Sequence, residues 1–355
     1  MACAQGFVPP EHVAALEQQV ARTEADLDKL RRAHPDWHAK IDEAIQAFNE
    51  SDLTRARTAF IQIDALIAAG RAELAAEAAR SKYAQATLFY PFEASRAEPL
   101  LCEAAELANS DVWYWVECAH ARIVIGNLAA AMVAFEAAHK LAVSGNVESD
   151  TRATLEGIGD VRFYQGDLTA ALAAYEESLE IRRALAARNP ADNAEWARDL
   201  SIGLHKVGDV RFDQGDLTAA LAAYEESLEI LRALAARDPG NATWARDVSI
   251  GLSRIGDVRS AQGDLTAALA AYEESLETRR ALAARDPDNA TWARDLWLLF
   301  WRLALTDPEN AKAHWAAAVR RMENMEERGT LLSTDRYYLD EARQNLATAN
   351  AAQPN

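Results

Sequence analysis

Apolar residues recur at helical spacing in two successive segments between residues 193 and 237. They follow one another at steps of three or four: Trp196, Leu200, Leu204 and Val207 in the first segment, and Leu217, Leu221, Tyr224, Leu228 and Leu231 in the second. This spacing gives each helix one apolar side. Gly215 can end the first helix in a left-handed conformation, and Asp216 can cap the next one. Asp238-Pro239-Gly240 ends the second helix. The pattern predicts an antiparallel pair of helices.

The same pair is encoded three times. Gly208-Asp209-Val210-Arg211 has counterparts that begin at Gly159 and Gly256, at intervals of 49 and 48 residues. A fixed period of this length is typical of a solenoid, in which each unit needs its neighbours to cover its apolar faces. The sequence therefore predicts a stack of helix pairs rather than a globular core.

Small residues decide how closely the two helices of a pair approach each other. Gly208, Ala220 and Ala223 would allow close contact between the two backbones, and Tyr224 would fill the space beside them. On the solvent side, Glu229 and Arg232 stand three residues apart, a spacing at which an ion pair contributes about 0.2–0.5 kcal/mol.

Val207-Gly208, Gly215, Ala220 and Tyr224 resemble the tetratricopeptide repeat, in which Leu-Gly, Gly, Ala and an aromatic residue stand at these spacings. The resemblance covers residues 155–294 well, and residues 115–138 match it at the ordinary spacing. The family repeat is about 34 residues long. The additional residues here, about 14 in each repeat, amount to nearly four helical turns. Kinesin-light-chain-like arrays are also built from lengthened repeats.

This resemblance implies an all-α, right-handed superhelical solenoid of antiparallel helix pairs. It implies a protein-binding scaffold or adaptor, similar to long arrays in bacterial signalling and defence proteins. We expect four segments: a heptad-patterned helix in 1–34, diverged helix pairs in 35–146, long near-identical repeats in 147–307, and capping helices in 308–355.

Two parts of the chain raise the alternative of a self-assembling protein. In the first segment Leu16, Val20 and Leu27 belong to a heptad pattern, which predicts either a short coiled coil between two copies or a helix folded back on the array. In the last repeat, an apolar run replaces the usual polar sequence. Its aromatic residues Trp297, Phe300 and Trp301 are either covered by the capping helices or exposed to a second copy.

Differences between the three repeats mark a candidate partner-binding groove. They concentrate at four positions of the first helix: Glu156, His205 and Ser253; Gly157, Lys206 and Arg254; Phe163, Phe212 and Ser260; and Tyr164, Asp213 and Ala261. In the resembled family, these positions line the concave groove. The differences are either drift at solvated positions or a groove lining that varies on a constant scaffold.

Asp160, Asp209 and Asp257 would also face this groove and form a repeated row of acidic residues, the acidic ladder. It predicts a partner segment that is basic or mixed in charge, or helical. In the alternative interpretation the ladder is structural and pairs with Arg211 and Arg259. A second repeated motif, Trp-Ala-Arg-Asp, begins at three tryptophans, which we expect to pack in the core: Trp196, Trp244 and Trp292.

Composition narrows the range of functions. The net charge of −18 argues against binding to nucleic acid or an anionic membrane, and the chain has no apolar run long enough for a membrane span. Three cysteines are too few for a disulfide framework, so we expect a reducing, cytoplasmic environment. The histidines match no metal-binding motif, and no phosphate loop or nucleophile motif is present. We therefore expect neither catalysis nor a metal or cofactor. The remaining alternative is an enzyme with an unrecognised site in the N-terminal half, which would need a deep pocket near Tyr83, Tyr90 or Trp113.

Overall fold

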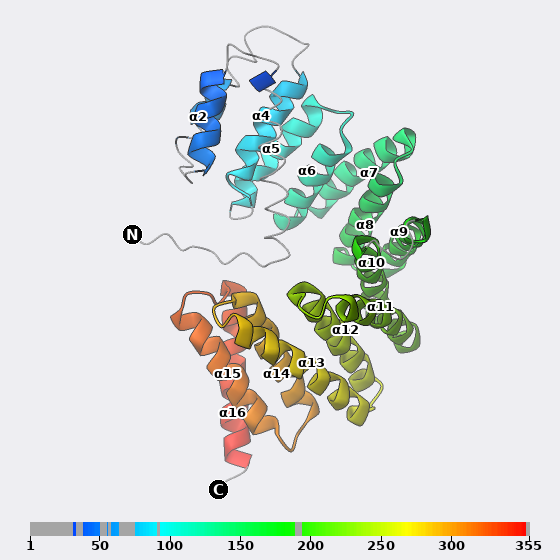
Figure 1. The fold of residues 1–355 in the computed structure, drawn as a ribbon, viewed down its shortest axis with the longest axis vertical. Helices are drawn as coiled ribbons and strands as arrows, with labels where there is room; N and C mark the ends of the chain where they lie inside the picture. Colours follow the sequence, from blue (N-terminus) through cyan, green and yellow to red (C-terminus); the bar gives the residue numbers. More distant parts are fainter. Residues whose placement is uncertain are drawn as a thin grey trace. The chain divides into compact units, whose positions relative to one another are not determined.

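The computed structural model describes residues 31–32, 38–49, 55, 58–63, 75–90, 93–188 and 194–352. Every regular element in these ranges is a helix, and consecutive helices pack against each other in antiparallel pairs (Figure 1). The α-helices are α2 (His38–Asn49), α4 (Ala75–Thr87), α5 (Ala94–Leu107), α6 (Val112–Val124), α7 (Leu128–Gly145), α8 (Glu148–Tyr164), α9 (Leu168–Arg188), α10 (Ala194–Asp213), α11 (Leu217–Arg237), α12 (Ala242–Ala261), α13 (Leu265–Arg285), α14 (Ala290–Thr306), α15 (Ala311–Glu327) and α16 (Arg336–Ala352). A short 3-10 helix, η3 (Ser333–Asp335), precedes α16. The predicted all-α class is confirmed.

The chain divides into two compact units, with the boundary inside α9 between Ile181 and Arg182. In the unit that ends at Ile181, each helix from α4 to α8 packs on the next one along the chain. The same holds in the other unit from α10 to α16. The segment boundaries at residues 34, 146 and 307 stay predictions. None of the described helices combines the length and apolar character needed to cross a membrane.

The predicted helix boundaries depend on caps that the structure contains. The side chains of Asp216 and Asp264 accept hydrogen bonds from the backbone amides of Ala219 and Ala267, each at 3.1 Å. Gly215 ends the preceding turn with a φ of 80°, which favours a residue without a Cβ atom. Each repeat therefore begins its second helix with the same two-residue device.

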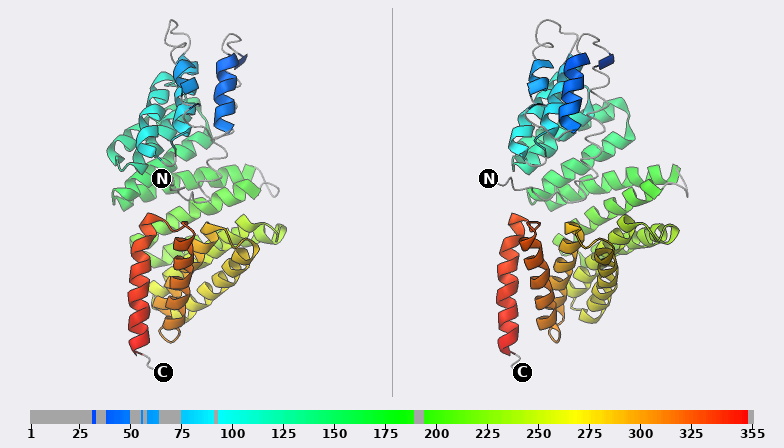
Figure 2. Two further views of the ribbon diagram at one scale, coloured as in Figure 1. Left: turned by 90° about the vertical axis from the view of Figure 1, so that its left-hand side faces the viewer. Right: turned by 60° about the vertical axis from the view of Figure 1, so that its left-hand side comes forward.

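The last repeat buries its aromatic residues beneath the C-terminal helices. Figure 2 shows α14, α15 and α16 side by side. Trp297 is 1% exposed and Phe300 is 8% exposed, while Trp301 packs edge-on against Trp315 and Tyr338, with ring centroids 4.8 and 5.5 Å apart. Of the two alternatives for this face, the capping helices cover Trp297 and Phe300, which contradicts their exposure to a second copy. The heptad residues Leu16, Val20 and Leu27 lie outside the described residues.

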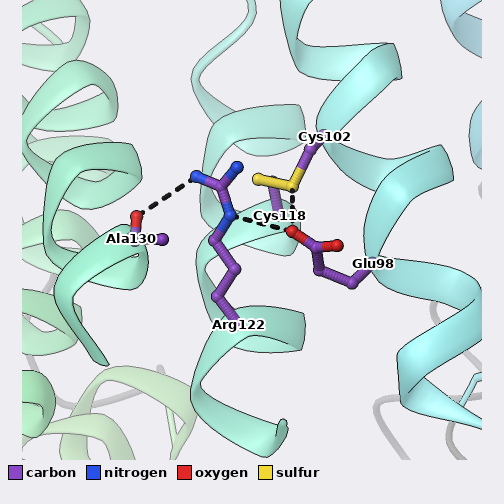
Figure 3. Close-up of a disulfide and its surroundings, with 5 residues drawn as sticks. All are labelled: Glu98, Cys102, Cys118, Arg122 and Ala130. Carbon is purple, nitrogen blue, oxygen red and sulfur yellow. Dashed lines mark hydrogen bonds and ion pairs between the residues drawn. A yellow bond between two sulfur atoms is a disulfide. The ribbon is translucent and has the colours of Figure 1, made fainter. Parts of the chain in front are cut away.

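A disulfide bond between Cys102 and Cys118 joins α5 to α6 (Figure 3). Both cysteines are buried. Beside the bond, Arg122 donates to a carboxylate oxygen of Glu98 at 3.0 Å and to the carbonyl oxygen of Ala130 at 3.2 Å, which connects α6 to α5 and to the first turn of α7. Three cysteines are too few for a framework, but two of them form this single bond. The argument from cysteine usage for a reducing environment therefore fails.

The disulfide predicts a difference in thiol content between the oxidised and reduced chain. Without reductant, the unfolded protein should expose one reactive thiol, that of Cys3, and after reduction it should expose three. Because the bond closes a loop of about 15 residues, the double variant Cys102→Ala with Cys118→Ala should lose about 3 kcal/mol of stability in denaturant unfolding. Cys3→Ser should remove the one thiol that reacts without reductant. Three reactive thiols without reductant would contradict the bond.

Candidate functional site

In each of the three long repeats, a glycine of one helix packs against a tyrosine ring of the other. We refer to α8, α10, α12 and α14 as first helices and to α9, α11, α13 and α15 as second helices. A Cβ atom built on Gly208 of α10 would lie 2.5 Å from the ring of Tyr224 on α11, closer than real contacts allow. The same distance is 2.4 Å for Gly256 and Tyr272, and for Gly159 and Tyr175. The predicted role of these residues in close helix contact is confirmed.

The same tyrosines bind the acidic ladder. The hydroxyl of Tyr224 donates to Asp209 at 2.5 Å, that of Tyr272 to Asp257 at 2.8 Å, and that of Tyr175 to Asp160 at 2.5 Å. Each aspartate directly follows the glycine beneath the ring, so a ring seated on the glycine also brings its hydroxyl to the carboxylate. The ladder therefore has a structural role in every long repeat.

The next repeat supplies a cation to the same carboxylates. Arg254 of α12 donates to Asp209 at 3.4 Å, and Arg302 of α14 donates to Asp257 at 2.7 Å. The arginines that the sequence suggested as partners lie elsewhere: Arg211 approaches Asp216 at 3.8 Å, and Arg259 binds Glu225 at 3.3 Å. The structural interpretation of the ladder is thus supported, but with different partners, and the surface around it is mixed in charge.

One of the predicted groove positions is internal. Ser253 is 3% exposed; its hydroxyl donates to the carbonyl oxygen of Ser249 at 3.0 Å and accepts from Arg279 at the same distance. His205, its counterpart in the preceding repeat, packs its ring edge-on against Tyr224 at 5.8 Å, and burial lowers its pKa. This position faces the second helix of its own pair. The prediction that Ser253 lines the groove is therefore wrong.

Two of the four variable positions, those of Phe163 and Tyr164 and their counterparts, lie nearer to solvent at the C-terminal ends of the first helices, whereas Gly157 is buried. Tyr164 is 61% exposed and Asp213 is exposed, while Phe163 and Phe212 are half-buried. Glu156 and Lys206 are also half-buried; Glu156 accepts from Arg152 at 3.4 Å. We call the last turns of α10 and α12, with Phe212, Asp213, Ser260 and Ala261, the variable turns; Phe163 and Tyr164 hold the same positions in α8, which belongs to the other unit. Among the predicted groove positions, these are the ones that lie nearest to solvent.

The Trp-Ala-Arg-Asp motif contains contacts between repeats that the sequence analysis missed. Its arginine binds the aspartate of the same motif in the next repeat: Arg198 binds Asp247 at 2.6 Å, and Arg246 binds Asp295 at 2.5 Å. The arginine of the last motif, Arg294, binds Asp335 of η3 at 2.7 Å instead. Asp335 is only 1% exposed, and both of its carboxylate oxygens accept hydrogen bonds from Arg294. The Arg-Asp pair, which is identical in each motif, is the feature of the sequence from which these contacts between repeats could have been predicted.

The tryptophan of the motif packs against apolar side chains of the repeat, as predicted. Trp244 is half-buried and lies against a cluster of leucines from α11 and α12 that includes Leu228 and Leu231. Its backbone amide donates to the side chain of Asn241 at 3.1 Å, so Asn241 serves as the N-cap of α12. Within the described residues no group of three or more His, Cys, Asp or Glu side chains is arranged to hold a metal ion.

Comparison with known proteins identifies the repeat. The tetratricopeptide repeat family matches residues 151–192, which contain most of α8 and all of α9. The apo form of RapI is similar in structure, with a TM-score of 0.54 and 13% identity, covering 88% of this chain and 86% of RapI. BtubC (BKLC) from P. vanneervenii gives a TM-score of 0.49 and 18% identity over 76% of this chain and 92% of its own.

Nearly identical TPR-like repeats of the kinesin-light-chain type from Podosopora anserina give a TM-score of 0.47 and 14% identity, covering 61% of this chain and 98% of theirs. At these identities, the likeness to RapI extends to the fold and no further. No protein of curated function matches the chain in sequence. The resemblance indicated by the spacing of glycine, alanine and tyrosine is confirmed.

The contact between glycine and tyrosine predicts opposite effects for two substitutions in α12. Gly256→Ala should destabilise the protein by about 1–3 kcal/mol, because the new methyl group would overlap the Tyr272 ring. Gly251→Ala is the matched control: its Cβ would lie 3.5 Å from His205, an ordinary contact, and alanine favours a helix by about 1 kcal/mol. Denaturant unfolding measures both. Equal effects would show that the tyrosine contact is unimportant.

The buried tyrosines predict a loss of stability in alkali. Burial, followed by the nearby aspartates, raises the pKa of Tyr175, Tyr224 and Tyr272 above the ordinary value of about 10. Because the folded chain holds these protons more tightly than the unfolded chain, their contribution is complete below about pH 10 and falls as the pH rises above it. Phenolate absorbance should show these three tyrosines ionising only as the helical circular dichroism is lost. Ionisation of all nine tyrosines with the helices intact would contradict this.

Proposed function

We propose that this chain, a tetratricopeptide-repeat protein, is a non-catalytic scaffold or adaptor that binds a segment of a partner protein at the variable turns of its long repeats. One observation carries the proposal. The three repeats keep the contact among glycine, tyrosine and aspartate unchanged, yet they present different side chains at the last turn of each first helix: Phe163 and Tyr164, Phe212 and Asp213, and Ser260 and Ala261. A constant scaffold with a varied outer surface suits recognition of an extended, non-repeating segment.

The chemistry of the variable turns suggests the character of this segment. Asp209 and Asp257 already have arginine partners, so a preference for a basic segment now depends on Asp213 and on the net charge of −18. The half-buried ring of Phe212 favours contact with apolar side chains. A helix with one apolar and one basic side would meet both requirements.

Reversing the charge at a variable turn tests the proposal. Asp213→Lys changes an exposed side chain at the end of α10, so it should leave the helix content and melting temperature unchanged. We expect it to weaken binding of the native partner by about tenfold, the effect of one unfavourable charge in a contact. The partner is captured from native lysate with the unaltered protein, and its affinity for each variant is then measured.

The control places the same change of charge on another surface. Glu229→Lys alters an exposed residue of α11, away from the variable turns, and should leave the affinity within about twofold of the original. Equal loss with both variants would indicate a general charge effect. Unchanged binding by Asp213→Lys would place the site elsewhere. If no protein binds the unaltered chain, the scaffold function is contradicted.

A further inference from the structure

Arginine–glutamate pairs connect successive second helices of the array. Arg183 of α9 donates to Glu226 of α11 at 3.1 Å, and Arg232 of α11 donates to Glu274 of α13 at 2.5 Å. These pairs form the outer ladder. Arg232 therefore reaches the next repeat instead of Glu229 on its own helix, and the predicted pair within α11 is wrong. Each step of the outer ladder needs an arginine on one second helix and a glutamate on the next.

The outer ladder stops at α15, where the sequence reverses the charge. The glutamates stand ten residues after the N-cap of their helix: Glu226 after Asp216, and Glu274 after Asp264. In α15 the N-cap is Asn310, and ten residues further stands Arg320. Arg280 of α13, the next arginine of the outer ladder, thus faces a helix that offers a cation in place of a carboxylate.

Arg280 and Arg320 line the same cavity, which has a volume of about 250 Å³. Its walls come from α13, α14 and α15: Arg280, Phe300, Ala317, Arg320, Arg321 and Asn324. The guanidinium of Arg280 lies over the Phe300 ring at 5.7 Å, and the His314 ring stacks with Phe300 at 6.4 Å. The cavity therefore combines three guanidinium groups, an amide donor and an aromatic surface.

The charge of this cavity is not balanced by the surrounding side chains. Within the part of the chain that the structure describes, no carboxylate lies within ion-pair distance of Arg280, Arg320 or Arg321. Glu323, three residues after Arg320, is bound to Arg343 of α16 at 2.9 Å instead. In a protein with a net charge of −18, three adjacent arginines without a carboxylate partner stand out, because their guanidinium groups can donate charge-assisted hydrogen bonds to an anion.

We propose that this cavity binds an acidic side chain from a partner protein, with its carboxylate in the place that the outer ladder gives to glutamate. The cavity is large enough for one side chain, and the small part of the Phe300 ring that lines it can contact an apolar residue next to the carboxylate. The ligand is therefore an acidic peptide with an adjacent apolar residue. This inference rests on the proposed protein-binding function, but it concerns different residues from the variable turns and a partner segment of opposite charge.

A defined peptide tests the site without the native partner. The probe is a fluorescein-labelled peptide, Glu-Glu-Phe-Glu-Glu, and its affinity for the full chain is measured by fluorescence anisotropy at low and at physiological salt. We expect saturable binding that weakens with salt. Arg320→Glu should weaken it at least tenfold, because the new carboxylate can pair with Arg280 as Glu274 pairs with Arg232.

Arg320→Glu restores the sequence pattern of the other repeats, so the variant should fold normally, with unchanged helical circular dichroism. Arg336→Glu, the same substitution at an exposed residue of α16, is the matched control and should change the affinity by less than about twofold. The peptide Gln-Gln-Phe-Gln-Gln should not bind. These three results together would support the proposal.

Other outcomes would overturn it. Equal affinity for the glutamate and glutamine peptides would mean that no carboxylate is recognised. Equal loss in Arg320→Glu and Arg336→Glu would show a general effect of charge. Binding of inorganic phosphate at this cavity without binding of the acidic peptide would assign the site to a free anion. Each result leaves the test of the variable turns unaffected, so the two proposals fail separately.

Discussion

The contact between a first-helix glycine and a second-helix tyrosine is the constraint on which the rest of the long repeats depends. With no Cβ atom on Gly208, the ring of Tyr224 lies directly on the backbone of α10. That position fixes the separation of the two helices, and it also brings the tyrosine hydroxyl to Asp209. The carboxylate then accepts a second bond from Arg254 of the following repeat. One steric fit inside a pair thus determines a polar contact between pairs.

Polar contacts between neighbouring repeats occur in three separate rows. The acidic ladder binds tyrosine and arginine, the Trp-Ala-Arg-Asp motif binds its own next copy, and the outer ladder connects second helices. The pairs of the outer ladder are exposed and contribute little individually, whereas those of the other two rows are partly buried. The pairs of all three rows recur with the period of the chain. They fix the register of one pair against the next, while apolar packing supplies most of the stability.

The C-terminal end of the array shows how a repeat is altered to stop stacking. Where no further copy of the motif follows, Asp335 of η3 takes the place of the motif aspartate and supplies the carboxylate partner of Arg294. Aromatic residues of α14 take the place of the polar first-helix sequence and are covered by α15 and α16. The outer ladder receives no such replacement. Its last arginine, Arg280, lies beside Arg320 in the same cavity. The other arginines of the ladder pair with glutamates of the next helix, whereas Arg280 is left to pair with a carboxylate of the ligand.

The sequence by itself determined the features that depend on local spacing. Helix pairs, their caps at Asp216 and Asp264, the repeat period, and the fit of Tyr224 against Gly208 all follow from residues that are close in sequence or that repeat at a constant interval. The tertiary structure decided which long side chains meet. Arg254 and Asp209 are 45 residues apart, and whether Ser253 faces solvent or Arg279 depends on the rotation of α12 about its axis. The disulfide between Cys102 and Cys118 is likewise a product of how α5 packs on α6, because cysteine count and spacing carry no information on the distance between two helices.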